Sequence, residues 1–460
     1  MSNSQSLKKP FRKLVTVSSL TAFLLASFLV ASGMNKVEAQ VSGSSEISAT
    51  SGSNRFVVWQ DETPGNADIF FRRSTDNGAT WKPKLNLSNN PGTSSSPQIA
   101  VSGSNVFVVW RQANADEELV QADIFFRKST DNGATWGSKI NISMTGSHHS
   151  SSPRVAASGS NVYIAWVDDN GVFSRRSADN GATWKPKVNL GNSVAPPQIA
   201  VSGSNVYVVW TGSNDILLRR STDGGATWKS VENLSNNAGE SVSPQVAVSG
   251  SNVYIIWTDL TPGNTDIFFR RSTDSGATWK SIVNVSNNPG QSRNSELTVS
   301  GSNVYVVWTQ FSSSGKCQPA DIFFRGSTNS GATWGSKIKI SASGTNFGTV
   351  CTGALPQVAA SGSNVYISWA DDGAGDVFFR RSTDSGATWK SIVNVSNNVG
   401  NSIDPQIAFS GLNAFVVWSD NTPGNHDILM KRSVNNGGSF QAVKNLSSNS
   451  GTSNMPQIGV

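Results

Sequence analysis

Aspartate pairs seven residues apart recur in three loops, each of which contains the letters TPGN. Paired carboxylates about 5–9.5 Å apart are the catalytic groups of glycosidases, and oxygen-rich loops bind calcium. The three pairs are Asp61 and Asp68, Asp259 and Asp266, and Asp420 and Asp427. No twelve-residue loop with calcium-ligand spacing is present, and Asp and Asn also cap loops. Repetition therefore favours loop capping, and calcium ligation by these loops remains the alternative.

Other residues that carry enzyme chemistry are few or lack partners. His148, His149 and His426 have no Cys or acidic partner at metal-ligand spacing. The chain contains no Gly-x-Ser-x-Gly motif, no Walker loop and no dinucleotide fingerprint. We therefore assign no catalytic residue, no metal ligand and no cofactor.

One turn sequence, STDNGATW at 74–81, indicates a repeat protein, because self-similarity at a regular spacing is the signature of repeat architectures. Copies or near-copies begin at residues 74, 129, 177, 221, 272, 327, 382 and 433. Seven of these turns end in Trp, and a second repeated segment ends in Trp eight times. Together the two positions account for all 15 tryptophans of the chain.

The repeat unit is exemplified by residues 244–290. We predict four strands in it, named first to fourth below, at 244–248, 252–257, 266–271 and 279–286. Each is short, rich in Val, Ile, Phe, Tyr or Trp, and bounded by Gly, Asn, Ser or Pro, as strands are. Four antiparallel strands per unit of about 44–61 residues is the spacing of a propeller blade. The sequence thus predicts an all-β fold, an eight-bladed β-propeller of four-stranded antiparallel blades.

Closure of the ring is also predicted. A first strand precedes seven of the repeats, and its eighth copy, PQIGV, is the last segment of the sequence, at 456–460. The corresponding place before the first repeat holds EISAT at 46–50, which is a poor copy. We therefore expect the C-terminal strand to complete the first blade. The alternative is an array that continues beyond this sequence.

The repeated turn has a structural explanation. Asp76 is expected to accept a hydrogen bond from the backbone N–H two residues on, as in an Asx turn. Asn77 and Gly78 supply the positive φ of a tight hairpin, and Trp81 is expected to open the fourth strand and pack on a neighbouring sheet. The motif needs no substrate to account for it.

The pattern S-x-D-x-G-x-T-W resembles the Asp-box, or BNR repeat, of sialidase-like propellers, over essentially the whole chain after the leader. The resemblance implies boxes on the periphery, away from any active site. Sialidases of that family also carry an Arg-Ile-Pro motif, an arginine triad, a Tyr nucleophile with a Glu partner and an Asp acid/base. This chain has no Arg-Ile-Pro, and its five tyrosines share one position of the second strand, where Phe stands in three other repeats. We read them as packing residues.

Arginine pairs end the third strand in five repeats, and such periodic pairs are expected to stack on rings and to pair with carboxylates. The pairs are Arg72-Arg73, Arg175-Arg176, Arg219-Arg220, Arg270-Arg271 and Arg380-Arg381. Asn-x-Ser sequons likewise share one position of the fourth strand, so repeat structure explains them before glycosylation does.

Residues 1–39 have the basic, apolar and small-residue order of a secretory signal, with an uncleaved membrane anchor as the alternative. They carry five Lys or Arg and one Glu, so the net charge falls from +6 to +2 without them. That remainder argues against nucleic-acid binding. We expect a protein that is secreted or on the cell surface, with a linker at 40–50 and the propeller at 51–460, and contact with a membrane only if the leader is retained.

Two repeats have enlarged loops on one rim: 111–123 in the second, and 309–321 in the sixth, which is followed by a long segment before the next first strand. Cys317 and Cys351 lie in the two insertions of the sixth repeat. An exported chain meets oxidising conditions, and we predict a Cys317–Cys351 disulfide. The alternative is two free thiols.

The second residue of each first strand is the candidate binding position, because this strand is the innermost one in sialidase-like propellers. We call these eight residues the collar and place them around the mouth of the central channel: Gln98, Arg154, Gln198, Gln245, Glu296, Gln357, Gln406 and Gln457. The sequence favours a binding or cell-surface scaffold module for a glycan or protein over an enzyme. The alternative is a glycoside hydrolase of the sialidase-like superfamily, of exo-sialidase type.

Overall fold

A computed structural model describes residues 52–460 except 64, 114–120, 145, 147–148, 194, 262, 312–319, 343–354 and 372. The chain divides into two units, 1–39 and 40–460, and all described residues belong to the second. The leader and linker at 1–50 therefore remain sequence predictions. Within the described ranges no helix is long and apolar enough to span a membrane.

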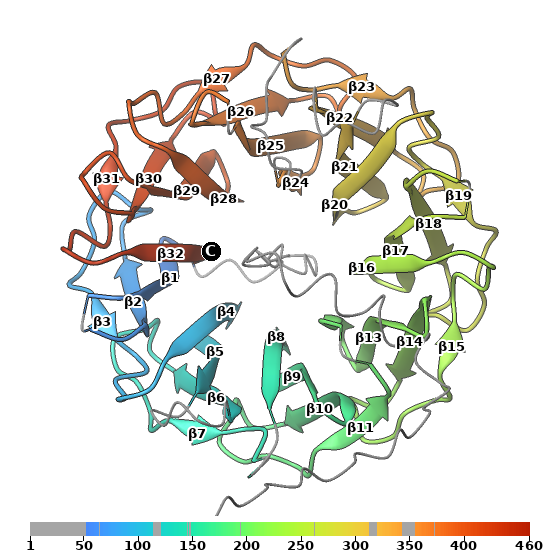
Figure 1. Ribbon diagram of the computed structural model, residues 1–460, viewed down its shortest axis with the longest axis horizontal. Coiled ribbons are helices and arrows are strands. Elements are labelled where there is room, and N and C mark those ends of the chain that lie inside the picture. Colours follow the sequence, from blue (N-terminus) through green and yellow to red (C-terminus); the bar gives the residue numbers. More distant parts are fainter. Residues whose placement is uncertain are drawn as a thin grey trace, which may run out of the picture. The chain divides into compact units, whose positions relative to one another are not determined.

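The described residues form eight four-stranded antiparallel sheets arranged as blades around a central axis (Figure 1). This confirms the predicted eight-bladed β-propeller. From the axis outward, blades 1 to 4 contain β32 (Ser453–Gly459), β1 (Arg55–Asp61), β2 (Asp68–Ser74), β3 (Leu85–Asn86); β4 (Ser94–Ser102), β5 (Asn105–Ala113), β6 (Ala122–Ser129), β7 (Ile140–Asn141); β8 (Ser150–Ser158), β9 (Asn161–Asp168), β10 (Gly171–Ser177), β11 (Val188–Gly191); β12 (Gln198–Ser202), β13 (Asn205–Gly212), β14 (Asp215–Ser221), β15 (Glu232–Asn233). Blades 5 to 8 contain β16 (Ser241–Ser249), β17 (Asn252–Asp259), β18 (Asp266–Ser272), β19 (Val283–Asn284); β20 (Gln291–Ser300), β21 (Asn303–Phe311), β22 (Ala320–Ser327), β23 (Ile338–Lys339); β24 (Gln357–Ser361), β25 (Asn364–Asp371), β26 (Asp376–Ser382), β27 (Val393–Asn394); β28 (Ser402–Ser410), β29 (Asn413–Asp420), β30 (Asp427–Ser433), β31 (Lys444–Asn445).

The C-terminal strand β32 closes the ring, as predicted. It pairs antiparallel with β1 of the first blade, and Val57 lies opposite Ile458 in this ladder. Figure 1 shows β32, coloured red, beside the blue strands of blade 1. The first blade is therefore built from both ends of the described chain.

The first and fourth strands differ in length from the prediction. In six blades the first strand begins three or four residues earlier, because a residue with positive φ, such as Ser243 at 55°, forms a bulge that lets pairing continue upstream. The fourth strand is only two residues long in seven blades. Trp81 precedes it rather than opening it. At Lys82, the backbone N–H donates to the Arg73 carbonyl at 2.8 Å, and the carbonyl accepts the Arg72 Nε–H at 2.7 Å.

The hydrophobic core consists of eight clusters, and each lies between two neighbouring blades. The second-strand tryptophans are at most 1 % exposed and anchor these clusters. Trp59 belongs to the cluster that joins blades 8 and 1, together with Phe415 of blade 8 and Val460, the residue after β32. Because apolar burial is the main stabilising term in folding, each blade depends on both neighbours.

The repeated eight-residue turn has the predicted backbone and one different hydrogen bond. Its two central residues have positive φ in all eight copies, as at Asn77 (54°) and Gly78 (78°). The Asp76 carboxylate accepts the backbone N–H of Thr80, four residues on rather than two, at 2.8 Å, and the Thr80 hydroxyl at 2.6 Å. These bonds, with the Thr80 hydroxyl first, lower the pKa of Asp76 to about 2.

Acid should destabilise the six turns that contain Asp. Their lowered pKa gives stability that is complete above the unfolded pKa, about 3.9, and is lost as pH falls toward the folded value. Asn329 forms the same turn without a carboxylate: its Oδ1 accepts the Thr333 backbone N–H, and its Nδ2 donates to the Thr333 hydroxyl. We expect Asp274→Asn to fold normally and to lose less melting temperature than the parent protein between pH 5 and pH 2. An identical acid profile would contradict this.

Candidate binding site: the polar collar

The collar residues lie on the eight innermost strands, so the structure brings all eight predicted positions into one ring (Figure 1). Their position along the innermost strands differs from the prediction, which placed them second in each strand. In six blades the collar residue is the fifth or sixth of its strand, because the bulge extends the strand upstream. Only Gln198 and Gln357 begin their strands. The collar therefore lies within the ring wall and not at the strand starts that would mark the channel mouth.

Collar side chains are buried, and several connect one blade with the next. Each retains 3–7 % of its surface exposed. Gln98 and Gln457 donate from Nε2 to the carbonyl of the preceding proline, at 2.9 Å in each case. Gln245 of blade 5 donates to the Ser295 carbonyl of blade 6 at 2.7 Å. These bonds satisfy buried polar atoms and tie the inner strands together.

Arg154 is the cation of the collar and is 3 % exposed. Its Nη1 donates to the Pro153 carbonyl at 3.0 Å, and its Nε donates to Gln198 Oε1 of the next blade at 3.3 Å. The arginine therefore repeats the proline contact of its glutamine counterparts and adds a bond between blades. The positive charge of Arg154 also lowers the pKa of Glu296 by electrostatic attraction.

Glu296 is the anion of the collar and is 5 % exposed. Its Oε1 accepts Gln357 Nε2 at 3.4 Å. Burial raises the pKa of Glu296 to about 8, against the lowering influence of Gln245, Gln357 and Arg154. Burial therefore favours the neutral carboxyl, whose O–H can act as a donor.

The paired aspartates act as acceptors within the blades. Asp259 accepts the Trp257 indole N–H at 2.9 Å, the Ser241 hydroxyl at 2.8 Å and the Thr261 backbone N–H at 2.9 Å. Asp266 accepts the Ser286 hydroxyl at 2.6 Å and the Asn284 side chain at 2.9 Å. Capping donors thus occupy both carboxylates, and no cluster of three His, Cys, Asp or Glu with metal-binding geometry is found among the described residues.

The sequon asparagines have the structural role that their periodicity predicts. Asn284 donates from Nδ2 to Asp266, and the sequon Ser286 donates to the same carboxylate. The pair Asn86 and Ser88 makes the same bonds to Asp68. Glycosylation on Nδ2 would replace one of the two amide hydrogens in this arrangement.

The five tyrosines are packing residues. All are at most 1 % exposed and occupy the second strands. Burial raises the pKa of four of them, in the case of Tyr366 to about 12. Because all five side chains are buried in packed sheets, the geometry offers none of them as a nucleophile.

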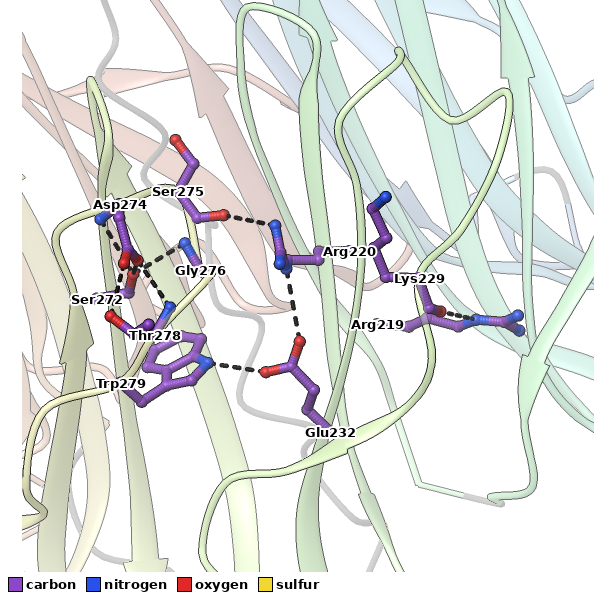
Figure 2. A network of polar contacts seen from close by, with 10 residues as sticks. All are labelled: Arg219, Arg220, Lys229, Glu232, Ser272, Asp274, Ser275, Gly276, Thr278 and Trp279. Carbon is purple, nitrogen blue, oxygen red and sulfur yellow. Dashed lines mark hydrogen bonds and ion pairs between the residues drawn. The ribbon is translucent and has the colours of Figure 1, made fainter.

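The arginine pairs bind mainly backbone carbonyls, and the predicted pairing with a carboxylate is found at Arg220, which contacts Glu232. The first arginine of each pair donates to the preceding blade, as Arg270 does to the Leu234 carbonyl at 2.7 Å. The second generally donates to the turn of the following blade, as Arg220 does to the Ser275 carbonyl at 3.3 Å. Figure 2 shows this junction, where Glu232 pairs with Arg220 at 3.5 Å. The carbonyl acceptors on neighbouring blades could not be identified from spacing along the sequence.

Some predicted residues fall outside the described part of the chain, and one contact near the enlarged loop of blade 2 was not predicted. Cys317, Cys351, His148 and the centres of both enlarged loops lie outside the described residues, so the predicted disulfide stays a prediction. Arg111 is the first residue of the enlarged loop in the second repeat, and its sequence position alone assigned it no partner. In the structure its Nη2 lies 3.0 Å from His149 Nε2, and the His149 backbone N–H donates to Asp169 at 3.0 Å. These contacts join residues of blades 2 and 3 that spacing along the sequence did not bring together.

Comparison with known proteins gives structural likeness only. No protein-family model and no curated protein matches the chain. Among solved structures, the polysaccharide lyase Uly1 is 10 % identical, with 70 % of this chain and 86 % of that chain covered and a TM-score of 0.47. The intramolecular trans-sialidase from Ruminococcus gnavus, in complex with oseltamivir carboxylate, is 12 % identical over 71 % of this chain and 89 % of that one, with a TM-score of 0.39. The leech intramolecular trans-sialidase is 13 % identical over 76 % and 67 %, with a TM-score of 0.40. These values identify no activity.

Proposed function

We propose that this protein is an exported, non-catalytic binding module of the Asp-box propeller type, which takes a glycan or protein ligand along the channel axis at the collar. The observation that carries the proposal is the pair of charged residues, Arg154 and Glu296, in a ring that otherwise uses glutamine. Burying ionisable groups where an amide makes the same bonds costs stability. Groups of this kind with a shifted pKa concentrate at functional sites.

The burial of the collar defines how a ligand would meet it. Because each side chain exposes only 3–7 % of its surface, the ligand would contact the collar end-on and not lie across it. Arg154 would then supply a donor to a ligand oxygen, and Glu296 would donate while protonated and accept once ionised. No described tyrosine is placed to act as a nucleophile, so the proposal contains no hydrolytic step.

A glycan array probed with the secreted protein tests this function, followed by titration of the best glycan. Arg154→Gln should weaken binding about 5- to 150-fold, which corresponds to losing a charged hydrogen-bond partner worth about 1–3 kcal/mol. Glu296→Gln should change affinity more at pH 9 than at pH 6, because Gln mimics the protonated acid. Lys229→Ala on the exposed outer rim is the matched control and should leave affinity unchanged.

Two results would contradict the proposal. One is release of fluorophore from a fluorogenic sialoside above the buffer rate, which would favour an exo-sialidase. The other is unchanged affinity in both collar variants together with loss in the rim variant.

A further inference from the structure

The junctions between blades share one aromatic contact. At five of them a third-strand phenylalanine meets the ring that ends the turn of the next blade, edge to face, with centroids 4.8–5.0 Å apart. The pairs are Phe71–Trp136, Phe126–Trp184, Phe269–Trp334, Phe324–Trp389 and Phe379–Phe440. Edge-to-face contacts at this distance are a preferred aromatic geometry.

The junction between blades 3 and 4 lacks this phenylalanine. Ser174 occupies the corresponding place on β10, and Trp228 is the ring of the next turn. A Cβ built on the turn glycine Gly331 would lie 2.5 Å from Phe269, whereas one built on Gly225 would meet Arg176 Cδ first, at 3.2 Å. The Tyr163 ring comes next, at 3.5 Å from that Cβ, and it is not among the residues that line the space described below.

The missing ring leaves a pocket of about 240 Å³ at this junction. Ser174, Val188 and Trp228 are among its lining residues, and Arg175, Arg176 and Lys185 surround it with positive charge. Trp228 is only partly buried. A dry cavity of about 150 Å³ is sufficient to bind benzene in another protein, so the volume accommodates one aromatic ring with a short substituent.

The charges at this pocket differ from those at the next junction. There, Glu232 pairs with Arg220 and accepts the Trp279 indole N–H at 2.9 Å (Figure 2). Val188 takes the place of Glu232 in blade 3 and offers no carboxylate. Arg176 bonds a backbone carbonyl, that of Gly224, at 3.0 Å. A guanidinium has five N–H donors, so this contact leaves others for an anion.

We propose that this pocket binds small aromatic carboxylates, with the ring in the space of the missing phenylalanine and the carboxylate toward Arg176 and Lys185. The ring would restore the edge-to-face contact with Trp228 that five other junctions make internally. Arginine and lysine supply charge-assisted hydrogen bonds to the carboxylate. This site is on the outer part of two blades and is independent of the collar.

Phenylacetate is the probe, and its binding is measured by isothermal titration or by ligand-observed NMR on the full propeller. We expect one equivalent to bind. Ser174→Phe should fill the pocket and weaken phenylacetate at least tenfold, while the variant folds with a melting temperature no lower than that of the parent protein. Arg176→Gln should weaken it about fivefold or more, and benzyl alcohol, which lacks the charge, should bind at least fivefold more weakly than phenylacetate.

A gain of binding provides the matched control. Blade 5 has the same arginine pair, Arg270-Arg271, but fills its pocket with Phe269. Phe269→Ser should therefore add a second equivalent of phenylacetate if the folded variant is recovered. Arg154→Gln should leave phenylacetate binding unchanged, which separates this site from the proposed collar function.

The proposal is overturned if phenylacetate does not bind, if Ser174→Phe binds it as well as the parent protein does, or if benzyl alcohol binds equally well. A folded Phe269→Ser variant with no second equivalent also counts against it. If that variant does not fold, the comparison of the parent protein with Ser174→Phe decides alone.

Discussion

Removal of Ser453–Val460 should abolish the cooperative unfolding transition of the propeller. The deleted residues include β32, the innermost strand of blade 1, whose ladder with β1 contains five residue pairs. Val460 is also part of the apolar cluster that joins blades 8 and 1. At about 1 kcal/mol for each hydrogen bond and about 1.5–3 kcal/mol for each buried aliphatic side chain, the loss is comparable to the whole stability of a typical domain.

The deletion would also expose β1 along its full length as an unpaired edge, and such edges promote aggregation. The matched control replaces the same eight residues by a Gly-Ser segment, which keeps chain length and removes the side chains. Both variants should lose the sharp thermal transition by circular dichroism, and adding the Ser453–Val460 peptide should recover part of it in the deletion. A deletion variant that melts like the parent protein would mean that the ring does not depend on this strand.

The features that the sequence predicted well are local and repeated. Positive φ at Asn77 and Gly78, the β-branched and aromatic residues of the strands and the spacing of tryptophans are each encoded within one repeat. Because each feature recurs in eight copies, its structural interpretation does not depend on any single residue. Closure by β32 was predictable for the same reason, because its sequence copies the other first strands.

The features that the sequence did not predict depend on contacts between blades. The arginine pairs bond to carbonyls of neighbouring blades, so their acceptors lie tens of residues away. The depth of the collar follows from a bulge at residues such as Ser243, whose positive φ has no clear local signal. Ser174 was visible as a serine in a column of mostly phenylalanine. The consequence of this serine, a missing ring at the junction, follows only from the contact that Phe269 makes with Trp334 at an equivalent junction.

The stability of the parent protein should fall as pH rises from about 5 to about 8, and Glu296→Gln should remove this loss. Burial raises the folded pKa of Glu296 to about 8, whereas the unfolded carboxyl titrates near 4.3. Between these values the folded state holds a proton that the unfolded state releases. The free energy of unfolding therefore decreases by about 1.4 kcal/mol per pH unit, and levels off above pH 8.

Urea unfolding at half-unit steps from pH 5 to pH 9 measures this effect. The Glu296→Gln variant should match the parent protein near pH 5 and be more stable at pH 8 by on the order of 3–4 kcal/mol. The exposed Glu240→Gln is the control and should follow the parent profile. Arg154→Gln should extend the decline to higher pH, because Arg154 is the cation that lowers the pKa of Glu296. Parallel profiles for the parent protein and Glu296→Gln would show that the buried acid is ionised at neutral pH. The collar would then hold an ion pair with Arg154 in place of a neutral hydrogen-bond donor.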